Sequence, residues 1–139
     1  MKRAIDLAKQ AGLEIPVGAI IVKDGKILSA CHNKKETLND VTAHAEILAI
    51  KEASKKLKNW RLENCEMYVT LEPCPMCAWA IINSRLKSVY FGSYDPNYGA
   101  LGSTIDLRKT ANSKLQVYGG IMEDECDKLL SEYFDKIRN

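Results

Sequence analysis

The sequence predicts one α/β domain in which helices cover both faces of a mixed, five-stranded sheet. Two observations lead to this: an apolar hairpin near the start of the chain, and an alternation of strands and helices after it. A hairpin makes antiparallel neighbours, whereas strand–helix alternation favours parallel ones. No repeat or flexible linker interrupts the 139 residues, so we expect a three-layer α/β/α sandwich that spans 1–139 as a single domain.

The first half of the chain predicts two helices and a hairpin. Apolar residues recur at helical spacing over 1–11, and Asp24-Gly25 is typical of a hairpin turn. Thr42 is a favourable N-cap. The expected elements are, in order, a helix over 1–11 that stops at Gly12, strands over 17–22 and 26–31, a loop over 32–42 and a helix from Thr42 to about Lys58. The residues expected to face inward from that helix are Ala43, Ile47, Leu48, Ile50 and Leu57.

The second half predicts alternating strands and helices. Pro75 suits a first helical turn, where the missing N–H would have no partner anyway. The expected elements are a strand over 67–71, a helix over 75–83, a strand over 88–91, a loop over 92–104, a strand over 116–118 and a helix over 124–137. The last helix is expected to be amphipathic, with Cys126, Leu129, Leu130, Phe134 and Ile137 on one face.

The composition is that of a globular protein, and its charge does not by itself indicate a polyanion-binding protein. The net charge is +2 and 27% of the residues are charged, and the clusters of Lys and Arg are typical of solvated helix faces. No apolar stretch approaches the roughly 20 residues of a membrane span. No secretory signal is visible, so we expect a cytoplasmic protein. Five cysteines, an odd number, favour reduced thiols over a disulfide framework.

Two short segments carry residue types that bind metals. Cys74 and Cys77 lie three residues apart at an expected helix start, so their sulfurs face one point, and the positive end of the helix dipole stabilises their thiolates. His44 lies in another first helical turn, and imidazole with two thiolates is a donor set that zinc prefers. Three protein ligands leave the fourth tetrahedral position for water, and Glu46 is placed to take a proton from that water.

Each half of this pattern has another interpretation when it stands alone. A Cys-x-x-Cys pair also occurs in redox proteins and in structural zinc sites, and a lone histidine at a helix start is more often hydrogen-bonded than a ligand. His-x-Glu at 44–46 followed by Pro-Cys-x-x-Cys at 73–77 is far more specific. The remaining Cys31, Cys65 and Cys126 are expected to be core thiols, and His32 a loop residue.

The combined pattern is the signature of the zinc-dependent base deaminases. Within that superfamily, which includes the cytidine and deoxycytidylate deaminases, the chain resembles the bacterial TadA-type tRNA adenosine deaminases over nearly its whole length. The matching segments are 14–19, Asn33, 42–47, 71–78, 91–92, Asp95, 99–100, 102–103, 119–121 and 125–126. The chain departs from the family at Trp79, where a glycine is common, and at Val41, which replaces a frequent proline.

The resemblance implies a cytidine deaminase-like fold and roles for individual residues. His44, Cys74 and Cys77 match the zinc ligands, with one Zn²⁺ per subunit and a bound water or hydroxide as fourth ligand, and Glu46 matches the proton shuttle. The residues that match substrate contacts are Asn33, Ala43, Cys74, Asp95 and Phe134.

The resemblance also implies a reaction and partners. It points to hydrolytic deamination of adenosine to inosine at the wobble position of a tRNA anticodon, with an arginine tRNA as the usual substrate. It implies binding of the anticodon stem-loop, a homodimer and no membrane contact. Two other functions remain open: a deaminase of free guanine, cytosine or cytidine with the same zinc chemistry, and a non-catalytic zinc-binding module, which would need four protein ligands and no Glu46.

Overall fold

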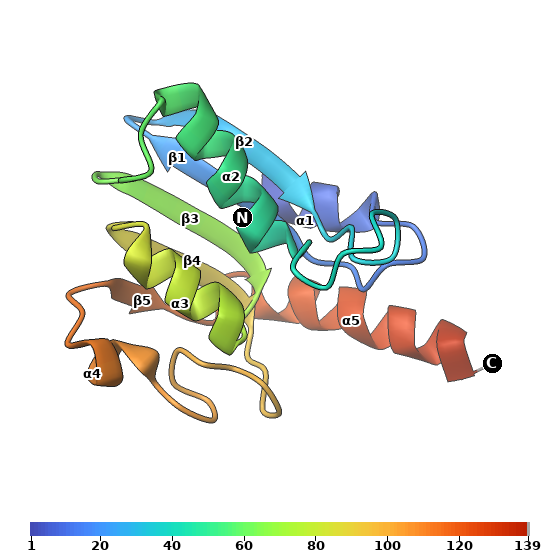
Figure 1. Cartoon of the computed structure of the whole chain (residues 1–139). Helices are drawn as coiled ribbons and strands as arrows, with labels where there is room; N and C mark the ends of the chain where they lie inside the picture. Colours follow the sequence, from blue (N-terminus) through green and yellow to red (C-terminus); the bar gives the residue numbers. More distant parts are fainter. Residues whose placement is uncertain (139) are drawn as a thin grey trace.

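The computed structural model describes residues 1–138 and shows a five-stranded sheet between two layers of helices (Figure 1). Across the sheet the strands are, in order, β2 (Lys26–His32), β1 (Gly18–Lys23), β3 (Cys65–Leu71), β4 (Ser88–Ser93) and β5 (Gln116–Tyr118). β1 pairs antiparallel with β2 and β3, whereas β3 with β4 and β4 with β5 are parallel pairs. The predicted mixed sheet is therefore confirmed.

The helices form the two outer layers (Figure 1). One face of the sheet is covered by α2 (Ala45–Leu57) and α3 (Pro75–Asn83), with the short α4 (Leu107–Ala111) beside α3, and the other face by α1 (Lys2–Lys9) and α5 (Glu123–Arg138). Two glycines allow the second layer to approach closely. A Cβ on Gly18 would overlap the carbonyl oxygen of Ala4 in α1, and a Cβ on Gly92 would overlap Cys126 in α5.

The core lies mainly between the sheet and the layer of α2 and α3. The residues that α2 contributes to this core are alanines. Ala45, Ala49 and Ala53 are completely buried, whereas Ile47 and Leu48, which were expected to point inward, are only partly covered. The helix lies so close to β2 that Ser29 Oγ donates a hydrogen bond to the carbonyl oxygen of Ala49 at 2.8 Å. Only small side chains fit into so narrow a gap.

One local prediction was wrong, and one short helix was not predicted. Thr42 is not the N-cap of α2, because its hydroxyl donates to Asp40 Oδ1 at 2.7 Å. His44, directly before the first helical residue Ala45, is the N-cap. Helix α4 was not predicted, because five residues are too few to show helical periodicity. Its one sequence signal is Asp106, whose side chain accepts a hydrogen bond from the backbone N–H of Arg108.

Helix α5 is much less buried than its apolar pattern predicts. Cys126 is buried, but Phe134 is 43% and Ile137 is 63% exposed, because the second half of α5 extends away from the sheet (Figure 1). Among the described residues, none of the helices is both long enough and apolar enough to cross a membrane.

Candidate metal centre and substrate pocket

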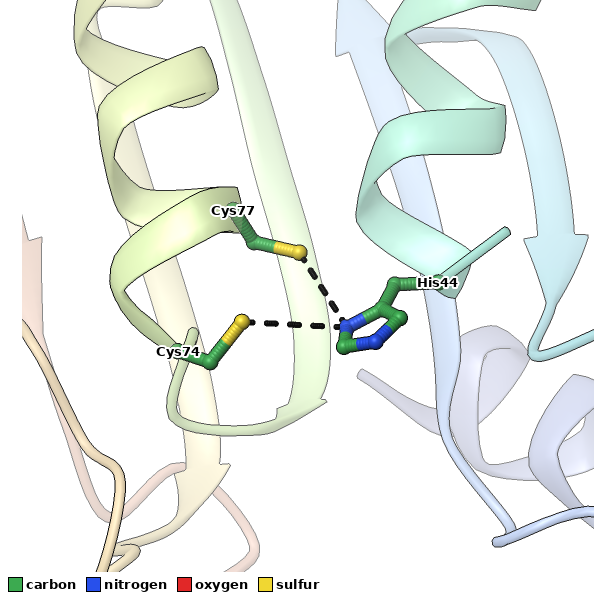
Figure 2. Close-up of side chains that lie close together, drawn as sticks. All are labelled: His44, Cys74 and Cys77. Carbon is green, nitrogen blue, oxygen red and sulfur yellow. Dashed lines mark hydrogen bonds between the residues drawn. The ribbon is translucent and has the colours of Figure 1, made fainter. Parts of the chain in front are cut away.

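The side chains of His44, Cys74 and Cys77 converge between the first turns of α2 and α3 (Figure 2). His44 Nδ1 lies 3.7 Å from Cys74 Sγ and 3.4 Å from Cys77 Sγ, and the three donor atoms all lie within 4.8 Å of one another. Nitrogen and sulfur ligands of one tetrahedral zinc ion are separated by about 3.5 Å, given the usual bond lengths. The donor types and their spacing therefore fit zinc.

The local backbone explains why these side chains meet. Cys74 is the N-cap of α3, with an extended conformation (φ −72°, ψ 173°), and Pro75 follows as the first helical residue. His44 is the N-cap of α2 with a similar conformation (φ −74°, ψ 150°). The partial positive charges of two helix N-termini therefore lie beside the two sulfurs and favour their thiolate forms.

Hydrogen bonds within the cluster set its protonation. Despite the partial burial of the Cys74 thiol, the hydrogen bond from Cys77 and then the neighbouring His44 lower its pKa to about 4. The hydrogen bond to Cys74 also raises the pKa of His44. For Cys77, the same bond to Cys74 and burial raise the pKa. The cluster thus provides a thiolate at neutral pH, which is the form that binds zinc.

Glu46 is buried in the first turn of α2, two residues after His44. Burial raises the pKa of its carboxyl group to about 7. A general acid or base works best when its pKa lies near the working pH, because it can then both accept and release a proton. The position and the pKa of Glu46 agree with the predicted role in proton transfer.

A pocket of about 420 Å³ opens beside this cluster. Its volume lies in the range of small-molecule sites, roughly 300 to 1,000 Å³. The pocket is lined by Ile15, Val17, Asn33, Lys35, His44, Ala45, Glu46, Leu71, Glu72, Cys74, Asp95 and Tyr98. Of the predicted site residues, His44, Glu46, Cys74, Asn33 and Asp95 thus share one pocket.

Asn33 stands in the pocket wall with one atom unsatisfied. Its side chain is 8% exposed, and its Nδ2 donates to the carbonyl oxygen of Ile15 at 3.4 Å. Its Oδ1 is buried and has no hydrogen-bond partner among residues 1–138. A buried acceptor without a partner is uncommon in a folded protein, so this oxygen is a candidate to accept a hydrogen bond from a bound ligand.

Two predicted contact residues lie outside the pocket. Ala43 is buried, its carbonyl oxygen accepting from the N–H of Lys34 at 3.0 Å and its own N–H donating to the carbonyl oxygen of Asp40 at 3.1 Å. Phe134 lies on α5, where its ring meets that of Tyr133 edge-on at 5.3 Å. It is not among the residues that line the pocket.

Two buried glutamates near the pocket were not singled out from the sequence. Glu14 accepts hydrogen bonds from Glu36 and Thr37, and Glu72 accepts them from the segment that follows β4. Their only sequence signal is that each stands in a segment that resembles the deaminases. The lining residues Tyr98 and Lys35 gave no signal of their own.

Comparisons with known proteins agree with this site. Residues 1–93 match the family described as the cytidine and deoxycytidylate deaminase zinc-binding region. The tRNA-specific adenosine deaminase of Bacillus subtilis (strain 168) is 45% identical over 142 residues, which cover 99% of this chain and 88% of that protein.

Solved structures show the same relationship. A tRNA:A34 deaminase, studied for A-to-I editing at the wobble position of transfer RNA, superposes with a TM-score of 0.90 at 41% identity and covers 94% of this chain and 97% of its own. A guanine deaminase from Bacillus subtilis has a TM-score of 0.65 at 38% identity, over 75% of this chain and 78% of its own. The chain therefore belongs to the family of tRNA-specific adenosine deaminases, within the cytidine and deoxycytidylate deaminases.

Proposed function

We propose that this protein hydrolyses adenosine to inosine at the wobble position of a tRNA anticodon, with an arginine tRNA as its substrate. The observation that carries the proposal is the His44–Cys74–Cys77 cluster with Glu46 beside it, at a pocket large enough for one base. The 45% identity with a tRNA-specific adenosine deaminase supports RNA as the substrate, which the net charge of +2 alone would not indicate.

The three ligands define what the metal contributes. One zinc ion per chain, with water as its fourth ligand, would act as a Lewis acid and lower the pKa of that water. Two thiolates and a neutral imidazole would balance the charge of the metal, so the site depends on a base to take the proton of the water. Glu46 is a buried carboxyl group that lines the pocket two residues after the ligand His44.

Glu46 carries the protons through the reaction. It accepts one proton as the water oxygen bonds to carbon 6 of adenine, and it delivers this proton to the ring nitrogen. It then transfers the second proton of the former water to the departing amine, so that ammonia leaves and inosine remains. Its pKa of about 7 allows it to act in both directions near neutral pH.

The pocket wall supplies the recognition of the base. The unpaired Oδ1 of Asn33 can accept a hydrogen bond from a base, and the base reaches it by leaving the stack of the anticodon loop. Asp95 lines the mouth of the pocket and is proposed to contact the neighbouring RNA. The exposed ring of Phe134 is proposed to stack against the anticodon arm.

We also propose a homodimer formed through the exposed side of α3. Met76 is 37% and Trp79 is 45% exposed there, and both are large apolar side chains of the kind that interfaces bury. Sedimentation equilibrium of the protein and of Trp79→Lys tests this: the wild type should be dimeric and the variant more dissociated.

The central experiment compares Glu46→Gln with the wild type. An unmodified arginine-tRNA anticodon stem-loop and free guanine, cytosine and cytidine are offered in parallel, while ammonia, inosine and bound zinc are measured. We expect inosine only from the RNA. The variant should keep its zinc and lose turnover by at least about a hundredfold, because general acid–base catalysis contributes that much or more.

Each competing function has its own outcome in this experiment. Ammonia from free guanine alone would favour the free-base deaminase. The 38% identity with a guanine deaminase is the reason to include free guanine as a substrate. Unchanged turnover in Glu46→Gln would remove Glu46 from the mechanism. Bound zinc without turnover of any substrate would favour a binding module.

A further inference from the structure

The carboxylate of Glu72 is the most heavily hydrogen-bonded side chain near the pocket. The side chain is only 2% exposed. It accepts hydrogen bonds from the backbone N–H groups of Asp95 at 3.1 Å, Leu101 at 3.2 Å and Ser103 at 3.1 Å, and from the hydroxyl of Ser103. All these donors belong to the segment 94–106 between β4 and α4, which we call the 94–106 loop.

The same loop is also joined to the chain directly before the metal ligands. The N–H of Ala100 in the loop donates to the carbonyl oxygen of Pro73 at 2.9 Å, and just before the loop the carbonyl oxygen of Ser93, the last residue of β4, accepts from the N–H of Glu72 at 2.8 Å. Pro73 immediately precedes Cys74. The loop is therefore held by both the backbone and the side chain of the turn that presents the ligand.

The loop passes directly over the Glu72 carboxylate. A Cβ on Gly99 would overlap the carboxyl carbon of Glu72 and the carbonyl oxygen of Asp95. A side chain at position 99 would therefore push the loop away from the Glu72 carboxylate. The loop residues next to Gly99 in space include Asp95, whose carbonyl oxygen accepts from the N–H of Gly99 at 2.9 Å. Asp95 and Tyr98 are the residues by which the loop lines the pocket.

We propose that Glu72 is a positioning residue for substrate binding: it fixes the 94–106 loop against the Cys74 turn and so holds Asp95 and Tyr98 at the mouth of the pocket. The proposal deepens the proposed function and rests on it for the identity of the substrate. A carboxylate is acceptor-only and can satisfy all four donors at once. Glutamine would replace one acceptor oxygen with an NH₂ donor, which would face N–H groups and leave them unpaired.

The test compares Glu72→Gln with Glu66→Gln, a control on β3, the strand that Glu72 directly follows; the Glu66 carboxylate accepts from Ser88 at 2.7 Å and does not line the pocket. For Glu72→Gln we expect a rise in KM for the anticodon stem-loop of at least about tenfold, from the loss of hydrogen bonds to a charged group. Its kcat should change by less than about threefold and its zinc content should be unchanged. Glu66→Gln should match the wild type.

Amide hydrogen exchange supplies a readout that needs no substrate. In Glu72→Gln, exchange should accelerate at Leu101 and Ser103 and stay unchanged in α2. Ser103→Ala removes one donor and leaves the carboxylate, so it should give a smaller rise in KM of the same kind even if the glutamine variant folds poorly.

The outcomes separate this proposal from the proposed function. Unchanged KM and exchange in both variants, loss of zinc, or a fall in kcat at constant KM would each overturn the positioning role. Absence of wild-type turnover on the stem-loop would instead overturn the proposed substrate, and the exchange of Leu101 and Ser103 would still decide whether Glu72 holds the loop.

Discussion

The two loops beside the pocket are each fastened by one buried glutamate, but at different places. The 33–44 loop, between β2 and α2, is held at its tip. Glu14 accepts from the N–H groups of Glu36 at 3.0 Å and Thr37 at 2.6 Å, and from the Thr37 hydroxyl at 2.9 Å. The 94–106 loop is held along its length, with donors at both ends of the segment bonded to Glu72.

This difference separates stability from substrate binding. The 33–44 loop has additional turns of its own, such as the hydrogen bond from the N–H of Leu38 to the carbonyl oxygen of Lys34 at 2.9 Å. Glu14 lies far from the ligands in the chain and connects the loop to the segment before β1. Glu72 stands two residues before Cys74, so its hydrogen bonds join the 94–106 loop to the turn that carries a metal ligand. Substitution of Glu14 should therefore lower the stability of the protein, whereas substitution of Glu72 should weaken substrate binding.

The largest effect on substrate binding is expected for Gly99→Ala. Because the new Cβ would overlap the Glu72 carboxyl group, the 94–106 loop must move outward and take Asp95 with it. We expect a KM for the stem-loop at least as high as that of Glu72→Gln, with zinc retained. Steady-state kinetics and metal analysis check this. A KM equal to that of the wild type would show that the loop and the carboxylate are not coupled.

The second largest effect is expected for Glu14→Gln, on stability. Burial opposes ionisation of Glu14, but the hydrogen bonds from Glu36 and Thr37 outweigh it and lower the pKa of the carboxyl group. A lowered pKa stabilises the fold above the unfolded-state value near 4.5, and this contribution is lost as the pH falls through the lower, folded-state value. At pH 7 the variant should lose about 2 kcal/mol of unfolding free energy, because the N–H groups of Glu36 and Thr37 lose hydrogen bonds to a charged acceptor.

Denaturation from pH 7 to pH 3 measures this contribution. The difference in unfolding free energy between the wild type and Glu14→Gln should shrink as the solution becomes more acidic. Glu36→Gln, whose side chain is exposed on the same loop, serves as the control and should leave stability unchanged. A difference that stays constant over this range would contradict the role assigned to the Glu14 charge.

The smallest effect is expected at Phe134, which belongs to neither loop. Phe134→Ala should raise KM for the whole tRNA by about fivefold without changing stability, because stacking of a base on an aromatic ring contributes about 1 to 3 kcal/mol and an exposed ring is expected at the lower end. Ile137→Ala, on the same helix and 63% exposed, is the control for lost apolar surface. Equal KM values for the two variants would remove the stacking role.

The metal cluster was predictable from the sequence because it depends on local geometry. His44, Cys74 and Cys77 each stand at a helix start, and the spacing of two such starts around strand β3 brings them together. The mixed sheet followed from the same reasoning, since a hairpin makes antiparallel neighbours and strand–helix units favour parallel ones. Where a feature depends on local helix and strand geometry, the pattern of residue types is therefore sufficient to predict which side chains meet.

The remaining features depend on contacts between distant segments. Glu72 bonds to residues 23 to 31 positions away, and nothing in its own neighbourhood indicates those partners. The amphipathic pattern of α5 shows an apolar face but not whether another element covers it, and Phe134 and Ile137 on that face remain exposed. Threonine is a residue type that often caps helices, yet the hydroxyl of Thr42 donates to Asp40 and His44 is the N-cap of α2.

The helix starts that hold the metal ligands have a thermodynamic consequence. At both N-caps, His44 and Cys74, no side chain hydrogen-bonds to the first turn, although such a bond typically stabilises a helix by about 1 kcal/mol. Two helices thus lack a stabilising side-chain cap, because their N-cap side chains point toward a common metal site instead. A metal bound there joins segments that lie 30 residues apart in sequence, so its binding free energy is also part of the free energy of folding. Metal supply would therefore govern how much folded protein a cell maintains as well as how fast that protein works.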